Sequence, residues 1–382
     1  MQTTIPVPHV DPLPLPGPVW LFTALLLVVF TLHLVAMNSA VGGGVWALWN
    51  YLRGRHGGHE YSRRLAGELA GMLPVFLAFT VTLGVAALLF LQVLYGNFFY
   101  ASSIVIGALW LAVIPLVIVA YYGYYYFSNT VAKGTGIAGC VLAISVCVLL
   151  AVGFIYVNNL TLMQNPGSWL GMYRAHPSGW NLNLGDRTVF PRYFHMINGA
   201  IAVFSAILAV LGLRKMKTDE GYGRWVLQRS AVVFAACTGL QFLFGMWLLL
   251  AIPRDIVLGL LSGPLAGAVF GVALIAAIAA MLLILLGSVN PRPAPMVQTG
   301  FAASLLTVFM MVCLRYLLRM EYLKPYANLS ALAVKPQVGV IVLFLLLFVG
   351  GLATVGYMLW LVARSGKGVD EAARPAKASV GS

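Results

Sequence analysis

Long apolar runs recur along the whole sequence, and they limit the fold more strongly than any other feature. Each run reaches about 20 residues, the length that an α-helix needs to cross the hydrocarbon core of a bilayer. Hydrophobic residues make up 61% of the 382 residues and charged residues only 9%, whereas a soluble domain is roughly a quarter charged. The sequence therefore predicts an all-α membrane protein with nine transmembrane helices. The expected spans lie near residues 18–47, 66–94, 99–127, 136–162, 189–213, 225–252, 264–288, 298–319 and 337–362.

The distribution of Lys and Arg predicts the orientation of these spans. The loops on one side, together with the C-terminal tail, carry about twice as many basic residues as the loops on the other side, and the basic side faces the cytoplasm. We therefore expect the N-terminus outside and the C-terminus in the cytoplasm. The net charge of +13 then reflects loops at a lipid surface and indicates no nucleic-acid partner.

We expect a single domain. Residues 1–363 form one transmembrane bundle, of which 1–17 are an extracytoplasmic leader. The small, polar segment 364–382 is expected to be a disordered cytoplasmic tail. The longest connection, about residues 163–188, lies outside and is a candidate surface for a partner subunit.

Two histidines lie where a membrane helix is normally apolar. His33 is near the middle of the first span and His195 is in the outer turns of the fifth. An ionisable side chain at such depth is costly and usually functional, and neutral imidazole is a common axial ligand of heme iron. Small residues follow both histidines, and they allow close approach by either a flat macrocycle or another helix. Heme ligation and a hydrogen-bonded histidine between packed helices both remain open.

Arginines near the outer face are candidates for binding the carboxylates of a heme. Arg192 lies one turn before His195, and Arg315 and Arg319 are one turn apart in the eighth span. Guanidinium groups form charge-assisted, bidentate contacts with carboxylates. The alternative is that each arginine extends towards the lipid headgroups.

Several motifs, taken in order, resemble subunit I of the cytochrome bd quinol oxidases. They are His33 followed by Gly42, YGNFFYASS at 95–103, NNLTLMQNPGSW at 158–169 and FPRYFHMINGA at 190–200. The resemblance covers residues 18–215, and the later spans agree mainly in topology. It implies one to three b-type hemes with His33 and His195 as axial ligands, a second membrane subunit and a possible quinone.

The resemblance also suggests roles for the polar stretch that ends the fourth span. Asn159 and Gln164 would contribute to a heme environment, while the same stretch caps the helix before Pro166. In the eighth span, Met311 is a candidate heme ligand, although ordinary packing explains most methionines.

The chain departs from the family where oxygen chemistry would need carboxylates. The third span reads AVIPLVIVAYYGYYYF without a glutamate, and the quinol-binding loop between spans six and seven is reduced to about IPRDIVLGLLSGP. We therefore expect an oxidoreductase subunit in a bacterial or archaeal cytoplasmic membrane. It would pass electrons between the quinone pool and an extracytoplasmic c-type cytochrome or other redox protein. The alternatives are a quinol:oxygen oxidoreductase and a heme-free membrane anchor of a redox complex.

Overall fold

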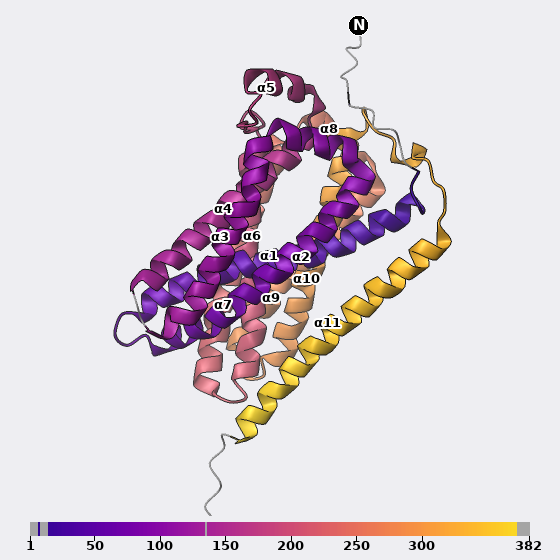
Figure 1. Ribbon diagram of the computed structural model, residues 1–382. Coiled ribbons are helices and arrows are strands. Elements are labelled where there is room, and N and C mark those ends of the chain that lie inside the picture. Colours follow the sequence, from indigo (N-terminus) through magenta and orange to yellow (C-terminus); the bar gives the residue numbers. More distant parts are fainter. Residues whose placement is uncertain (1–6, 8–13, 134–135, 373–382) are drawn as a thin grey trace, which may run out of the picture. The chain divides into compact units, whose positions relative to one another are not determined.

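The computed structural model describes residues 7, 14–133 and 136–372, and these residues are largely helical (Figure 1). Nine of the helices in this part of the chain are long and apolar enough to cross a membrane, which confirms the expected number of spans. They are α1 (Val19–Gly54), α2 (Glu60–Val105), α3 (Gly107–Thr130), α4 (Gly136–Met163), α6 (Val189–Lys215), α7 (Glu220–Ala251), α9 (Pro264–Val289), α10 (Ala294–Leu323) and α11 (Val338–Ala372).

Short helices occupy some of the connections. They are α5 (Trp169–Ala175), α8 (Arg254–Ser262) and the 3-10 turns η1 (Val131–Lys133), η2 (Pro166–Ser168) and η3 (Leu329–Ala331). Helix α11 continues to Ala372, beyond the expected start of the tail at 364. The rest of that tail, residues 373–382, and most of the expected leader lie outside the described residues.

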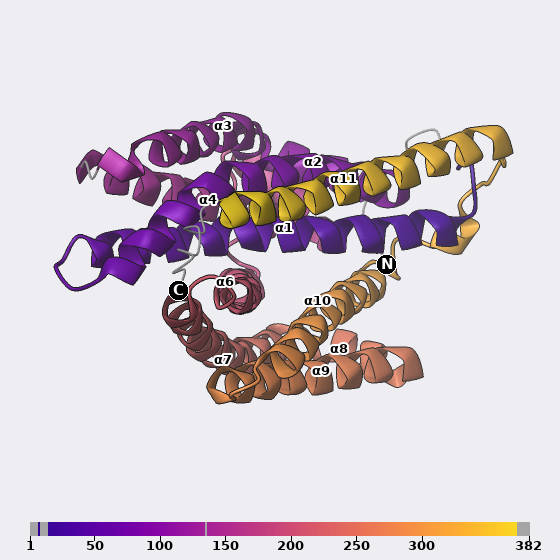
Figure 2. The same ribbon diagram turned by 90° about the horizontal axis from the view of Figure 1, so that it is seen from below.

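The described residues belong to two compact units, and the first, Phe22–Ser330, contains all candidate site residues. Within it, α2, α3 and α4 pack against one another, whereas α7, α9 and α10 form a second group (Figure 2). Helix α6 packs against α7 and also contacts α4 and α10, so it joins the two groups. Its apolar window is 56% buried, the largest share among the nine spans, which makes α6 the centre of this unit.

Helix α1 approaches α6 closely because small residues line its contact. A Cβ atom added at Gly42 would overlap the carbonyl oxygen of Ala200 and lie 2.8 Å from the Cβ of Phe204. The Trp46 indole donates a hydrogen bond of 3.0 Å to the Ser205 hydroxyl across the same interface. The small residues after His33 therefore serve helix packing at this position, as small residues commonly do between membrane helices.

Helix α2 bends where the sequence predicts that a span ends. Tyr95 leaves the helical region of backbone conformation, with φ −136° and ψ 28°, directly before Gly96. The chain then resumes a helix to Val105 rather than entering the next span at residue 99. The motif YGNFFYASS thus forms the last turns of α2, and the third span begins only at Gly107.

The polar end of α4 connects three parts of the chain. Asn159 accepts a hydrogen bond of 2.5 Å from the Ser102 hydroxyl and donates one of 3.0 Å to Ser103, both in the last turns of α2. The Asn158 side chain accepts a hydrogen bond of 2.8 Å from the backbone N–H of Asn183 in the following loop. Each side chain supplies partners that lipid cannot supply.

The same loop also stabilises the break between α2 and α3. The Asn181 side chain donates a hydrogen bond of 2.8 Å to the carbonyl of Val105, the last residue of α2. The backbone N–H of Ala108 donates to the Gly179 carbonyl at 3.2 Å. Gly179 has φ +78°, and a Cβ atom there would lie 2.7 Å from the Ala108 nitrogen, so glycine suits this position on both counts.

The second unit combines residues 14–21 with the segment from Ala331 onward. Leu15 pairs with Val334 in a parallel bridge, in which the Leu15 N–H donates to Ala333 at 2.8 Å and Lys335 donates to Leu15 at 2.9 Å. A further bond joins Gln337 to Pro16 at 2.8 Å. The segments that precede α1 and α11 are therefore held side by side by their backbones.

We expect Gly42→Ala to destabilise the protein because the new methyl group meets backbone atoms that cannot turn aside. Overpacking of this kind costs about 1–3 kcal/mol. The matched control is Gly71→Ala, also inside a helix, where a Cβ atom meets nothing within 4 Å. That control should be neutral or stabilising by about 0.5–1 kcal/mol. Thermal unfolding in detergent tests both variants, and equal midpoints would contradict the close α1–α6 contact.

We expect Asn159→Ala to cost about 1–3 kcal/mol because the buried Ser103 hydroxyl loses its donor and Ser102 keeps only the Phe99 carbonyl as a partner. A double-mutant cycle with Ser102→Ala should give a coupling energy of about 0.5–3 kcal/mol. The control is Asn165→Ala, an exposed residue whose side chain makes no capping hydrogen bond, with an effect within about 0.5 kcal/mol. Additive effects of Asn159→Ala and Ser102→Ala in unfolding experiments would rule out the bond between α2 and α4.

Candidate functional site

A cavity among α1, α2, α4 and α10 brings together His33, Arg315 and Arg319, three of the side chains that the sequence analysis selected. Arg315 and Arg319 are one helical turn apart and therefore share a face of α10. The wall contains no acidic side chain. The lining residues are Leu26, Leu27, Phe30, His33, Gly84, Ala87, Leu88, Leu91, Tyr156, Leu160, Val312, Arg315, Tyr316 and Arg319.

The orientation of the His33 ring is set by helix α2. Its Nδ1 atom lies 3.0 Å from the carbonyl oxygen of Thr80, which can only accept a hydrogen bond, so Nδ1 carries the proton. The ring lies against Gly84, where a Cβ atom would be 2.8 Å from His33 Cε1. The other nitrogen, Nε2, is consequently the one with a free lone pair. A histidine that ligates a metal typically donates its second ring N–H to a carbonyl or carboxylate in this way.

The arginines of this region make no direct ion pair with an acidic side chain in the described part of the chain. Among the described residues, Arg192, Arg315 and Arg319 form no salt bridge. The guanidinium carbon of Arg315 lies 5.0 Å from the centre of the Phe30 ring, and that of Arg319 lies 5.2 Å from the Tyr95 ring. Arg319 Nε is buried without a hydrogen-bond partner. Unpaired buried charges are costly, so an anionic ligand would stabilise this arrangement.

Arg192 extends the same group of positive charges from helix α6. It lies within electrostatic reach of Arg315 and Arg319. Its Nε donates a hydrogen bond of 3.1 Å to the Thr188 hydroxyl, which in turn donates to Asp186 at 2.7 Å. Its Nη2 atom is buried without a partner. This chain of bonds fixes Arg192 to the end of the outer loop.

His195 does not line the cavity that contains His33. It lies between α6 and α7, where a Cβ atom at Gly245 would be 3.6 Å from its Cε1. Its Nδ1 is buried and has no hydrogen-bond partner among the described residues. One turn further along α6, the Asn198 side chain donates to Cys237 at 2.8 Å and to Gln241 at 2.9 Å, which fastens the two helices together. The two histidines therefore belong to separate environments.

The remaining candidates from the sequence are less closely associated with the cavity. Asn159 uses its side-chain amide for Ser102 and Ser103, and Gln164 is buried at the end of α4. Met311 is not among the lining residues, although its neighbour Val312 is. Their proposed roles at a heme stay predictions.

Sequence reasoning did not select the tyrosines of this region. Tyr156 and Tyr316 line the cavity, and Tyr95 lies beside Arg319 with a hydroxyl that has no hydrogen-bond partner. The sequence carries 17 tyrosines, and membrane proteins commonly place them at the interface. Residue type alone therefore gave no signal. Tyr95 is distinguished only in the structure, by the bend of α2 and by its unsatisfied hydroxyl beside Arg319.

The side chains around the cavity are of the kinds that bind a heme, but the cavity is too small to hold one without rearrangement. One imidazole with a free Nε2 can bind iron, and two arginines can receive carboxylates. No group of three or more His, Cys, Asp or Glu side chains that could hold a bare metal ion occurs in the described part of the chain. The cavity measures about 70 Å³, while ligand pockets span about 300–1,000 Å³. A macrocycle therefore enters only if apolar side chains of the wall turn aside.

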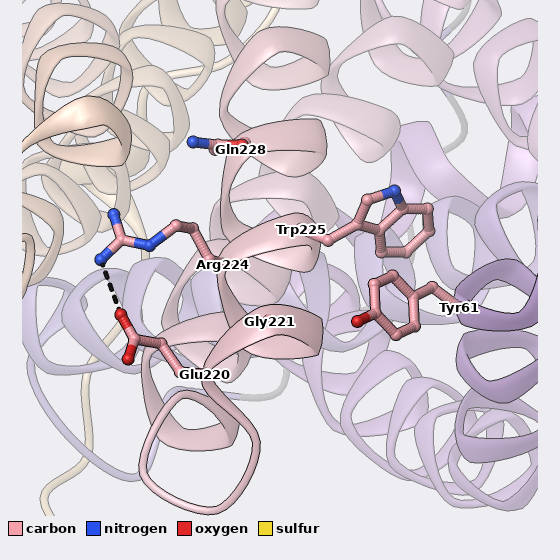
Figure 3. A pocket seen from close by; sticks show the side chains of 6 residues that line it. All are labelled: Tyr61, Glu220, Gly221, Arg224, Trp225 and Gln228. Carbon is pink, nitrogen blue, oxygen red and sulfur yellow. Dashed lines mark hydrogen bonds and ion pairs between the residues drawn. The ribbon is translucent and has the colours of Figure 1, made fainter.

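A second hollow lies at the first turns of α7 (Figure 3). It is larger, about 480 Å³, and contains none of the predicted site residues. An ion pair of 3.2 Å between Arg224 and Glu220 crosses its edge (Figure 3). Its lining residues are Tyr61, Glu220, Gly221, Arg224, Trp225 and Gln228.

An ion-pair network adjoins this second hollow. Glu68 accepts hydrogen bonds from Arg64 at 3.3 Å, Lys215 at 3.0 Å and the Tyr222 hydroxyl at 3.2 Å. Asp219 accepts from the backbone N–H of Tyr222 at 3.0 Å and from Arg64 at 2.6 Å. Both bonds favour the carboxylate and hold the pKa of Asp219 below its ordinary value, the backbone bond most strongly. This network joins the beginnings of α2 and α7 and the end of α6.

Comparison with known proteins identifies the fold. No family model and no curated protein sequence matches the chain. Among solved structures, the structure of bd oxidase from Geobacillus thermodenitrificans is similar, with a TM-score of 0.69 and 14% sequence identity. The match covers 92% of this chain and 100% of that chain. The chain is thus a multi-pass membrane protein with the fold of bd oxidase, as the order of its sequence motifs suggested.

Proposed function

We propose that the chain is a heme b-containing electron-transfer subunit of a respiratory membrane complex. In this proposal, His33 and His195 are axial ligands of one to three hemes, and Arg192, Arg315 and Arg319 bind propionates. The observation that carries the proposal is the geometry of His33. Its Nδ1–H is directed to the Thr80 carbonyl, and it shares a cavity with two arginines that have no acidic partner.

The residues of the chain would bind, orient and insulate such a cofactor. When bound, the heme supplies one-electron chemistry at its iron. The Thr80 carbonyl holds the imidazole in the tautomer that leaves Nε2 free. Leu88, Leu91 and Leu160 would exclude water from the macrocycle, and the arginines would neutralise its carboxylates. This arrangement supports electron transfer without requiring a proton donor in the membrane.

The positions of the acidic residues favour electron transfer over oxygen reduction. The chain contains ten Asp and Glu residues, and none lies between Glu68 and Asp186. Oxygen reduction consumes protons, and intramembrane carboxylates are the usual means of delivering them. A quinol:oxygen oxidoreductase is therefore the second candidate, supported by the fold shared with bd oxidase. A heme-free anchor of a redox complex is the third.

We further propose the topology and partners that this function requires. The N-terminus lies outside and the C-terminus in the cytoplasm of a bacterial or archaeal cytoplasmic membrane, as the basic residues indicate. A second membrane subunit of the bd type packs against the bundle in lipid. The outer loop with α5 meets an extracytoplasmic c-type cytochrome or another redox protein, and the quinone pool is the second electron partner.

The first test is the dithionite-reduced minus air-oxidised spectrum of the purified protein, with a pyridine hemochrome count. We expect low-spin b-type bands that carbon monoxide does not shift. His195→Ala should remove one band, and His33→Ala should reduce the heme content, because each removes an axial ligand. The control is His176→Ala in the outer loop, where the side chain is exposed and the spectrum should not change.

Other outcomes of this experiment decide between the alternatives. A heme that binds carbon monoxide would overturn the electron-transfer proposal in favour of the oxidase. A well-folded protein without heme would leave the anchor and would overturn the roles of both histidines. Normal spectra for both histidine variants would show that the ligands are elsewhere.

A further inference from the structure

Tyr95 occupies an unusual position at the bend of α2. Its backbone is non-helical, and its side chain is only 2% exposed. Its hydroxyl lies next to Tyr316 and Arg319, yet it makes no hydrogen bond of acceptable geometry with either. An unsatisfied buried polar group costs about 1–3 kcal/mol, and in lipid no water can replace the missing partner.

Arg319 presents a second unsatisfied donor at the same place. The residue is 6% exposed, and its guanidinium carbon lies 5.2 Å from the centre of the Tyr95 ring. Its Nε–H has no acceptor. Two buried donors therefore converge, and one of them is positively charged. The side chains that line the nearby cavity include neutral acceptors, the hydroxyls of Tyr156 and Tyr316 and the His33 ring, but no carboxylate.

The missing partner is an acceptor with negative charge, because it must satisfy a hydroxyl and a guanidinium together. A carboxylate has two oxygens that can each receive one of these donors. Charge-assisted hydrogen bonds of this kind are about twice as strong as neutral ones. Since the described residues supply no carboxylate here, it must arrive with a ligand.

We propose that Tyr95 and Arg319 form a carboxylate site that receives one propionate of the heme bound at His33. This inference rests on the proposed function and adds Tyr95 as a positioning residue. Gly84, which touches the His33 ring, and Tyr95 are eleven residues apart on α2, or about 16 Å. Ala87, Leu88 and Leu91 line the cavity between them. One elongated ligand can thus contact the imidazole and the carboxylate site.

The test is Tyr95→Phe in the heme-loaded protein, because this change removes only the hydroxyl oxygen. The variant should release heme more readily to an excess of a heme-scavenging protein. Its affinity for heme should fall about 10- to 100-fold, as expected for the loss of a hydrogen bond to a charged group. The midpoint potential should become more negative, because the carboxylate then keeps more of its charge. The stability of the heme-depleted protein should not fall, since the hydroxyl has no internal partner to lose.

The matched control is Tyr124→Phe. Tyr124 is also fully buried, but its hydroxyl donates a hydrogen bond of 2.8 Å to the Ala40 carbonyl. This variant should lose stability while its heme affinity and midpoint potential stay unchanged. If Tyr95 has only a structural role, Tyr95→Phe should also lose stability while its heme affinity and midpoint potential stay unchanged. That result would overturn the inference.

A second experiment on Tyr95→Phe changes the ligand instead of the protein. The dimethyl ester of heme b carries no negative charge on its side chains but keeps neutral carbonyl acceptors, so the difference in affinity between wild type and Tyr95→Phe should be clearly smaller with the ester than with heme b. An undiminished difference would overturn the carboxylate site. Wild-type protein that contains no heme overturns the proposed function as well. Heme in the wild type with unchanged affinity and potential in Tyr95→Phe overturns only the role of Tyr95.

Discussion

The hydrocarbon core of a membrane offers no hydrogen-bond partner, and this constraint governs the whole structure. Helices satisfy the backbone of the spans, so the remaining question is where polar side chains find partners. At the end of α4, Asn159 pairs with Ser102 and Ser103, and Asn158 holds the backbone of Asn183. These bonds explain why an apolar chain carries amide groups at this position, and they attach α4 to both α2 and the outer loop.

Most exceptions to this rule lie around the cavity, and one lies at His195, between α6 and α7. Five buried side-chain atoms have no hydrogen-bond partner among the described residues, and four of them belong to Tyr95, Arg192, His195 and Arg319. The fifth is the hydroxyl oxygen of Ser62, near the start of α2. A protein normally satisfies its buried polar groups, so these exceptions support the ligand site that we propose. The sequence had selected three of these four residues on chemical grounds.

The spans could be predicted well because their apolar length is a local property of the sequence. The bend at Tyr95 and the continuation of α2 to Val105 could not, since they depend on the outer loop, in which Asn181 satisfies the last carbonyl of α2. Likewise, intramembrane position pointed to His33 and Arg319, but only tertiary packing shows that they share a cavity while His195 does not. The role that we propose for Tyr95 rests on its unsatisfied hydroxyl, which no sequence pattern can reveal.

The two ends of the bundle use charge in opposite ways, and the contrast bears on function. Around the beginnings of α2 and α7, every basic side chain of the network has an acid nearby: Glu68 pairs with Arg64 and Lys215, and Asp219 pairs with Arg64. Around the cavity, Arg315 and Arg319 have none in the described part of the chain. An acid on a neighbouring helix would have neutralised these arginines permanently and would have repelled an anionic cofactor. In the proposed heme complex, the unpaired arginines would leave the neutralising charge to the ligand, so binding of the ligand and satisfaction of the buried cations would be the same event.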